Sequence, residues 1–121
     1  RACVCTWHVC LWHCAVHPSG FSRTQDAGVP PLSEEESAAF LEQVNSDWNV
    51  IDNHHLIRKW EFPDFATSLD FTNKLGAICE EQGHHADFQL SWGKVVAIIF
   101  THKIDALTES DFVLASKFDQ I

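Results

Sequence analysis

The 121-residue chain carries 8 Lys and Arg against 17 Asp and Glu, a formal net charge of −9 with histidine neutral. A length near 120 residues favours one domain, and the negative charge argues against direct binding to nucleic acid or to an anionic membrane surface. No apolar run approaches the roughly 20 residues that span a bilayer, and with 45% hydrophobic residues the chain is not compositionally disordered.

Residues 1–28 differ in composition from the rest of the chain. They hold four of the five cysteines, several Trp and His, and almost no charge. Thiolates and imidazoles are ligands of zinc, which makes a metal site one hypothesis, although the spacing matches no known zinc finger. A presequence remnant is a second hypothesis, because the first acidic residue is Asp26. We expect an unstructured or non-native extension over 1–28 and a domain over 29–121.

The segment 33–44 follows two prolines and has the pattern of a helix. Ser33 can cap the first turn while Glu36 reaches back to the Ser33 amide, which is the reciprocal arrangement of a capping box. Phe40 and Val44 belong to the apolar stripe of this segment. The sequence therefore predicts a helix that ends near Asn45.

Two short segments, 48–51 and 56–62, alternate between apolar and polar residues. Alternation of this kind is typical of a half-buried strand. The intervening residues 52–55 are polar and suit a turn. We predict a β-hairpin in which His54 and His55 are exposed at the turn.

A longer helix is predicted over residues 65–82. Asp64 can cap its amino end, and Gly83 is typical of the left-handed residue that terminates a helix. Cys79 lies among the apolar positions of this helix. We expect its thiol to be buried as a small apolar side chain.

A second hairpin and a last helix complete the chain. The strands are predicted over 88–92 and 95–101, with His102 continuing the second strand, and Thr108 is expected to cap a helix from residue 109. The element order is then α-β-β-α-β-β-α. Two hairpins cannot form a parallel sheet by themselves, so we predict an α+β fold with a four-stranded antiparallel sheet and helices packed on one face.

Three histidines lie at positions where they could act together. His84 and His85 follow the predicted helix terminator directly, and His102 lies at the end of the last strand. Three imidazoles near one point suggest a zinc site or metal-free proton transfer. A purely structural role is the third alternative that the spacing leaves open.

These histidines belong to a longer pattern that resembles the signature of the pterin-4a-carbinolamine dehydratases. The signature has an acidic residue, a His pair, an aromatic residue, a third His and a downstream Asp, and its positions are filled by Glu80, His84, His85, Trp92, His102 and Asp111. The resemblance covers about residues 32–121 and implies the same α-β-β-α-β-β-α fold. Family members often have Pro at Ala86 and Gly at Ala106, and Ala106 would be awkward only if that position needs a positive φ.

The resemblance implies a dehydratase that converts 4a-hydroxytetrahydropterin to quinonoid dihydropterin in tetrahydrobiopterin recycling. It makes His84 and His102 the candidate acid/base pair, leaves His85 to orient the substrate, and implies no metal or other cofactor. Glu80 and Asp111 would support the imidazoles. The remaining residues expected to contact substrate are Ala86, Trp92, Thr101 and Lys103. For Trp92 a place in the core is the alternative.

Partners are also implied by the resemblance, whereas the compartment is a separate expectation, because nothing in the sequence demands secretion. A homodimer or homotetramer is expected, with the helix at 64–82 apolar enough for subunit contact. Cytoplasm is the expected compartment, or an organelle if residues 1–28 are a presequence remnant. The alternative function is that of a protein-binding dimerisation cofactor or transcriptional coactivator, because animal relatives serve a homeodomain transcription factor in this way.

Overall fold

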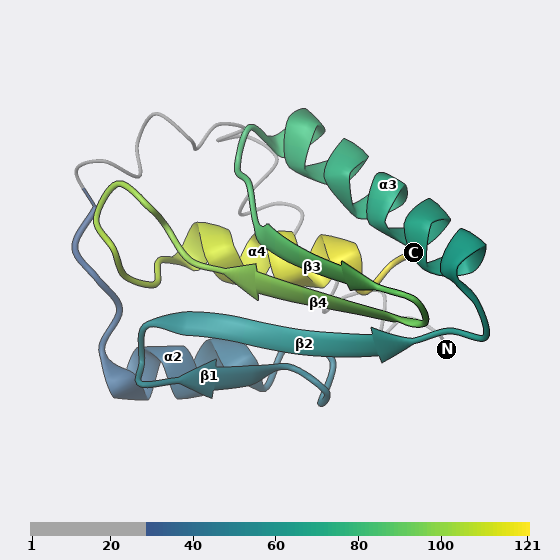
Figure 1. The fold of residues 1–121 in the computed structure, drawn as a ribbon. Coiled ribbons are helices and arrows are strands. Elements are labelled where there is room, and N and C mark those ends of the chain that lie inside the picture. The colour runs from purple at the N-terminus through teal and green to yellow at the C-terminus, as the bar shows by residue number, and fades with distance from the viewer. Residues whose placement is uncertain (1–28) are drawn as a thin grey trace, which may run out of the picture.

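The computed structural model describes residues 29–121. The predictions made for residues 1–28, a zinc site, a presequence remnant or an unstructured extension, lie outside the described residues. The elements in chain order are α2 (Glu34–Leu41), β1 (Asn49–Ile51), β2 (His55–Glu61), α3 (Phe65–Gln82), β3 (Asp87–Ser91), β4 (Lys94–Ile99) and α4 (Glu109–Phe118). This order confirms the predicted α-β-β-α-β-β-α arrangement (Figure 1).

The four strands form one antiparallel sheet in the order β1-β2-β4-β3. β2 and β4 are therefore central, and they pair with Leu56 opposite Ile99 and Trp60 opposite Val95. The two predicted hairpins supply the outer pairs, β1 with β2 and β3 with β4. The predicted four-stranded antiparallel sheet is confirmed.

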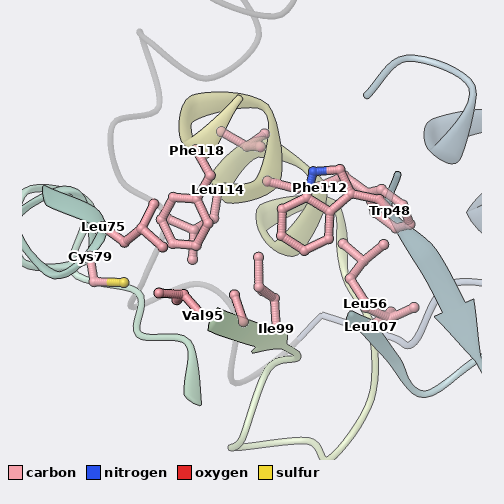
Figure 2. Close-up of a cluster of buried hydrophobic side chains, with 13 residues drawn as sticks. Trp48, Leu56, Leu75, Cys79, Val95, Ile99, Leu107, Phe112, Leu114 and Phe118 are labelled. Atoms are coloured by element: carbon pink, nitrogen blue, oxygen red, sulfur yellow. The ribbon is translucent and has the colours of Figure 1, made fainter. Parts of the chain in front are cut away.

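The three described helices cover one face of this sheet, as predicted (Figure 1). Val95, Ala97 and Ile99 alternate along β4 toward the helices and are fully buried. Figure 2 shows how side chains of the sheet meet those of α3 and α4 in one apolar cluster. The largest buried members are Trp48, Leu56, Leu75, Ile99, Leu107, Phe112, Leu114 and Phe118.

The ends of the helices follow the local signals in the sequence. Ser33 and Glu36 form the predicted capping box, with the Glu36 amide donating to Ser33 Oγ at 3.1 Å. Asp64 Oδ1 accepts from the Thr67 amide at 2.8 Å at the start of α3, and Gly83 ends that helix with φ 67°. The first helix is shorter than predicted, because it ends at Leu41 rather than near Asn45.

Strand β4 is also shorter than predicted, since it ends at Ile99. Thr101 pairs only with Ala106, through an isolated bridge. The backbone between these two residues is closed by two further bonds, from Ile104 N to Thr101 O and from Asp105 N to His102 O. Residues 100–106 therefore form a compact loop, which is called the His102 loop below.

Leu32 joins the His102 loop region to the turn of the first hairpin. Its amide donates to Leu107 O at 3.0 Å, and its carbonyl accepts from Asn53 Nδ2 at 3.0 Å. Two turns that are distant in sequence are thus tied through one peptide segment. In the part of the chain that the structure describes, no helix is long and apolar enough to cross a membrane.

Candidate active site

The register of the second hairpin brings the three predicted histidines to one end of the strands β3 and β4. Asp87, the first residue of β3, pairs with Ile98 near the end of β4. Because the strands are antiparallel, the loop before β3 and the loop after β4 lie at the same end of the hairpin. His84 and His85 stand in the first loop, and His102 stands in the second.

His84 is held by a buried carboxylate. Its Nε2 lies 2.6 Å from Asp111 Oδ1, and the Asp111 side chain has no exposed surface. Asp111 Oδ2 accepts from Thr101 Oγ1 at 2.9 Å and from the Thr108 amide at 2.8 Å. These bonds satisfy a charge that would otherwise be costly to bury. Asp111 therefore serves both in the capping box of α4 (Glu109–Phe118) and as the partner of His84.

The other two histidines also face carboxylates through Nε2. His85 Nε2 lies 2.5 Å from Glu80 Oε2, and His102 Nε2 lies 3.4 Å from Asp87. A carboxylate accepts hydrogen bonds, so the tautomer with hydrogen on Nε2 suits each of these contacts. His85 and His102 are about half exposed, whereas the His84 side chain is mostly buried.

Glu80 and Asp87 refine the predicted set of supporting residues. The sequence placed Glu80 four positions before His84, but the structure pairs it with His85 instead. Asp87 was not predicted to support any histidine, although it faces His102. The predicted strand began at residue 88, so Asp87, the first residue of β3 in the structure, lay just outside the hairpin expected from the sequence.

Cys79 lies beneath the loop that carries the histidine pair. Its side chain is 1% exposed, and burial raises the pKa of the thiol, partly opposed by the hydrogen bond from the Ala86 amide. A buried thiol with a raised pKa is a poor nucleophile. The structure thus agrees with the prediction of a buried apolar role for Cys79.

The remaining residues that were predicted to contact substrate do not all lie at this end of the hairpin. Ala86 is half-buried against the core and Lys103 is exposed in the His102 loop. Thr101 is buried and turned toward Asp111. Trp92 follows the far end of β3, away from the histidines, and is 70% exposed. The alternative of a core position for Trp92 is therefore wrong.

The positive φ in the His102 loop falls on Asp105, at 54°, and not on Ala106. Ala106 is therefore free of the strain that a side chain meets in the left-handed region. The departure from the family pattern at Ala106 has no backbone cost. Asp105 carries that cost instead, and its carboxylate contacts His54 at 2.9 Å.

His54 and His55 were predicted to be exposed, and this prediction is wrong. Both side chains are partly buried. The ring centroids of His54 and Phe100 are 4.7 Å apart, and those of Phe100 and His102 are 4.2 Å apart. A turn of the first hairpin thus reaches the loop that carries His102.

Residues 29–121 contain no group of three His, Cys, Asp or Glu side chains arranged to hold a metal ion. A groove of about 560 Å³ lies away from the histidines, between α2 and the first hairpin. Its lining includes Ser37, Leu41, Val50 and Asn53 and none of the predicted site residues.

Comparison with known proteins gives a consistent result. The family model described as pterin 4 alpha carbinolamine dehydratase matches residues 30–121. A relative from Alkaliphilus metalliredigens is 50% identical over 93 residues, which cover 77% of this chain and 84% of the relative. One from Rubrobacter xylanophilus is 49% identical over 94 residues, covering 78% and 87%. Both are provisionally named as pterin-4-alpha-carbinolamine dehydratases.

Solved structures show the same fold. A protein from Brucella melitensis, described as a transcriptional coactivator/pterin dehydratase, superimposes with a TM-score of 0.69 at 25% identity, covering 75% of this chain and 97% of that one. A pterin dehydratase-like protein described as a RuBisCO assembly factor of the alpha-carboxysome gives 0.52 at 20% identity, covering 61% and 87%. The second likeness concerns the fold alone.

Proposed function

Because the chain belongs to the pterin 4 alpha carbinolamine dehydratase family, we propose that it removes water from 4a-hydroxytetrahydropterin to give quinonoid dihydropterin. The observation that carries the proposal is the paired arrangement of His84, His85 and His102, each with a carboxylate against Nε2. Such rings can give or take a proton at Nδ1 while the carboxylates hold their orientation.

The reaction needs two proton transfers. The bond between C4a and the hydroxyl oxygen breaks, and hydroxide is a poor leaving group unless an acid protonates it. The pterin ring loses a proton from nitrogen as the new double bond forms, and a base must accept it. The balance is one substrate giving one dihydropterin and one water. Neither step requires a metal or a redox cofactor, so we propose a metal-free hydro-lyase.

We assign the acid and base roles to His84 and His102. His102 is about half exposed, so it can contact the substrate directly. His84 lies in the neighbouring loop, where its contact with Asp111 fixes the ring. His85, held by Glu80, would orient the pterin. Ala86 directly follows His85, and Lys103 directly follows His102. Both residues would line the substrate site.

The proposed place of this activity is the recycling of tetrahydrobiopterin. An aromatic amino acid hydroxylase leaves the 4a-hydroxypterin, and a reductase would consume the quinonoid product. We expect the protein to act in the cytoplasm.

A second candidate function is that of a protein-binding coactivator. The observation that favours it is an exposed apolar patch formed by Phe65, Leu69 and Trp92, which are 40%, 41% and 70% exposed. Ser68 Oγ donates to Trp92 O at 3.3 Å and brings the hairpin tip against α3. Exposed aromatic patches of this kind mark protein contacts. The same patch would serve the homodimer or homotetramer that we expect.

The test is an assay of quinonoid dihydropterin formation from freshly generated 4a-hydroxypterin, in the presence of EDTA. We expect activity with the chelator present. Substitution of His84→Ala or His102→Ala should slow the reaction by about two to four orders of magnitude, the usual contribution of one positioned proton-transfer group. Glu61→Gln, which removes an exposed carboxylate paired with Lys59, is the control.

Three outcomes would contradict the proposal in different ways. An unchanged rate in the double variant of His84 and His102 contradicts the acid/base roles. Loss of activity on chelation with recovery by zinc supports a metalloenzyme instead. A wild-type chain that does not accelerate dehydration contradicts the enzymatic function and leaves the coactivator candidate.

A further inference from the structure

The turn of the first hairpin holds the His102 loop at two points, one on each side of His102. His54 Nε2 lies 2.9 Å from Asp105 Oδ1, three residues after His102. The His54 ring also lies 4.7 Å from the ring of Phe100, two residues before His102. The contact between His54 and Asp105 joins residues that are 51 positions apart in the sequence.

The His54 ring is itself fixed on several sides. Its Nε2 donates to the Asp105 carboxylate, and its Nδ1 lies 3.1 Å from Nδ1 of His55. Two imidazole nitrogens at this distance share one hydrogen, so one ring donates and the other accepts. The ring face packs on Phe100. Both nitrogens and one face of the His54 ring are therefore in contact with neighbouring side chains.

His102 has the longest carboxylate contact of the three histidines of the site. Its nearest carboxylate, Asp87, is 3.4 Å away, and its side chain is 51% exposed. His84, in contrast, has a 2.6 Å contact with a carboxylate that has no exposed surface. The closest ring contact of His102 is Phe100, with centroids 4.2 Å apart. The orientation of His102 therefore depends on Phe100.

We propose that His54 is a positioning residue for His102, acting through the stacked ring of Phe100 and through Asp105. This inference builds on the proposed function, in which His102 transfers a proton. Both the His54 and the His102 ring pack on Phe100, at 4.7 and 4.2 Å, and among the described residues no hydrogen bond or ring contact joins the two histidines directly. His54 thus acts on geometry and does not touch the reacting atoms.

The first experiment compares steady-state dehydration by the full-length wild type, His54→Ala and the control Glu61→Gln. A small displacement of a catalytic group can cost up to about 100-fold, and we expect kcat of His54→Ala to fall about tenfold with KM changed less than twofold. Asp105→Gly should lower kcat in the same direction. Gly suits the positive φ at this position, so a loss there cannot come from backbone strain.

A double-mutant cycle separates positioning from general loss of structure. If His54 acts through His102, His54→Ala should cause no further loss in the His102→Ala background. An equal loss in both backgrounds would overturn the proposal, as would an unchanged kcat in His54→Ala. Thermal unfolding of each variant verifies that it is folded under the assay conditions.

A spectroscopic readout keeps this inference separate from the proposed function. If the wild type does not dehydrate the 4a-hydroxypterin, the proposed function fails while the positioning of His102 can still be tested. Ring ¹H–¹⁵N correlation spectra should then show a shift of the His102 resonances in His54→Ala and none in Glu61→Gln. His102 resonances that are unchanged in His54→Ala would overturn the inference.

Discussion

Arg58 and Asp119, which are 61 positions apart in the sequence, form an ion pair of 2.6 Å between β2 and the residue that follows α4. Both side chains are largely buried, with 12% and 17% of their surface exposed. Asp119 also accepts from Trp48 Nε1 at 2.8 Å and from the Asn45 amide at 2.9 Å. The carboxylate thus joins the end of α4 to the segment before β1 and to the central strand.

Removal of this carboxylate should destabilise the fold strongly. Asp119→Ala leaves the Arg58 guanidinium buried beside Trp60 without its closest partner, and such losses cost about 3–5 kcal/mol. Urea unfolding of the variant measures the change. The control is Asp70→Ala, which removes an exposed pair with Lys74 and should cost less than about 0.5 kcal/mol. Similar losses in the two variants would contradict the role assigned to Asp119.

Substitution of Asp111 should affect both rate and stability. In Asp111→Asn one oxygen becomes an amide nitrogen, which cannot accept from His84 Nε2 while the other oxygen accepts from Thr101 and the Thr108 amide. We expect the free energy of unfolding to fall by about 1–3 kcal/mol and the dehydration rate by about 10- to 100-fold.

Thr101→Val is the matched variant for Asp111→Asn. It removes one donor to Asp111 but leaves the contact between Asp111 Oδ1 and His84. Its free energy of unfolding should fall by about 1 kcal/mol, with a smaller loss of rate than in Asp111→Asn. Equal rate losses in the two variants would contradict a specific contribution of the contact between Asp111 and His84.

Two glycines give opposite expectations for the same substitution. A Cβ at Gly93 would lie 2.6 Å from the carbonyl oxygen of Phe62, whereas one at Gly76 meets nothing within 4 Å. Gly93→Ala should lower the free energy of unfolding by about 1–3 kcal/mol, because the Phe62 backbone must move. Gly76→Ala should raise it by up to about 1 kcal/mol, the helix propensity difference. Urea unfolding of both variants measures the change in the free energy of unfolding. A change of the same sign in both would contradict these expectations.

The cap of α3 should contribute to acid sensitivity. The Thr67 side chain and amide lower the pKa of Asp64, so Asp64 favours the folded state above the ordinary aspartate pKa of about 3.9. That contribution is lost as pH falls from about 4 through the lower pKa of the folded state. Asp64→Asn keeps an acceptor for the Thr67 amide but does not titrate. Its stability should therefore decline less than that of the wild type over this range, measured by urea unfolding at successive pH values.

The sequence was sufficient for the features that depend on neighbouring residues. The caps at Ser33 and Asp64, the terminator at Gly83 and the two hairpins all follow from local patterns, and the structure confirms them. The contact between Asp111 and His84 spans 27 positions. Local patterns predicted Thr108 as the cap of this helix but did not identify His84 as the specific partner of the Asp111 carboxylate.

The turn at His54 shows why contacts between distant segments could not be predicted from the sequence. Its polar residues predicted a turn correctly, and Asp52 and Asn53 have the positive φ values of a tight turn. The packing of His54 on Phe100 depends on the register between β2 and β4, which sets Leu56 opposite Ile99. This register is fixed by the assembled sheet. Hydrophobic alternation identifies a strand but does not identify its neighbour.

The position of Leu32 has a consequence for how the domain is delimited. Its amide bonds to Leu107 and its carbonyl accepts from Asn53, so the segment that enters the domain ties the His54 turn to the end of the region that carries His102. A boundary drawn by helices and strands would start at Glu34 and discard both bonds. A fragment of the chain that keeps both bonds must therefore begin before α2, in a stretch that is neither helix nor strand.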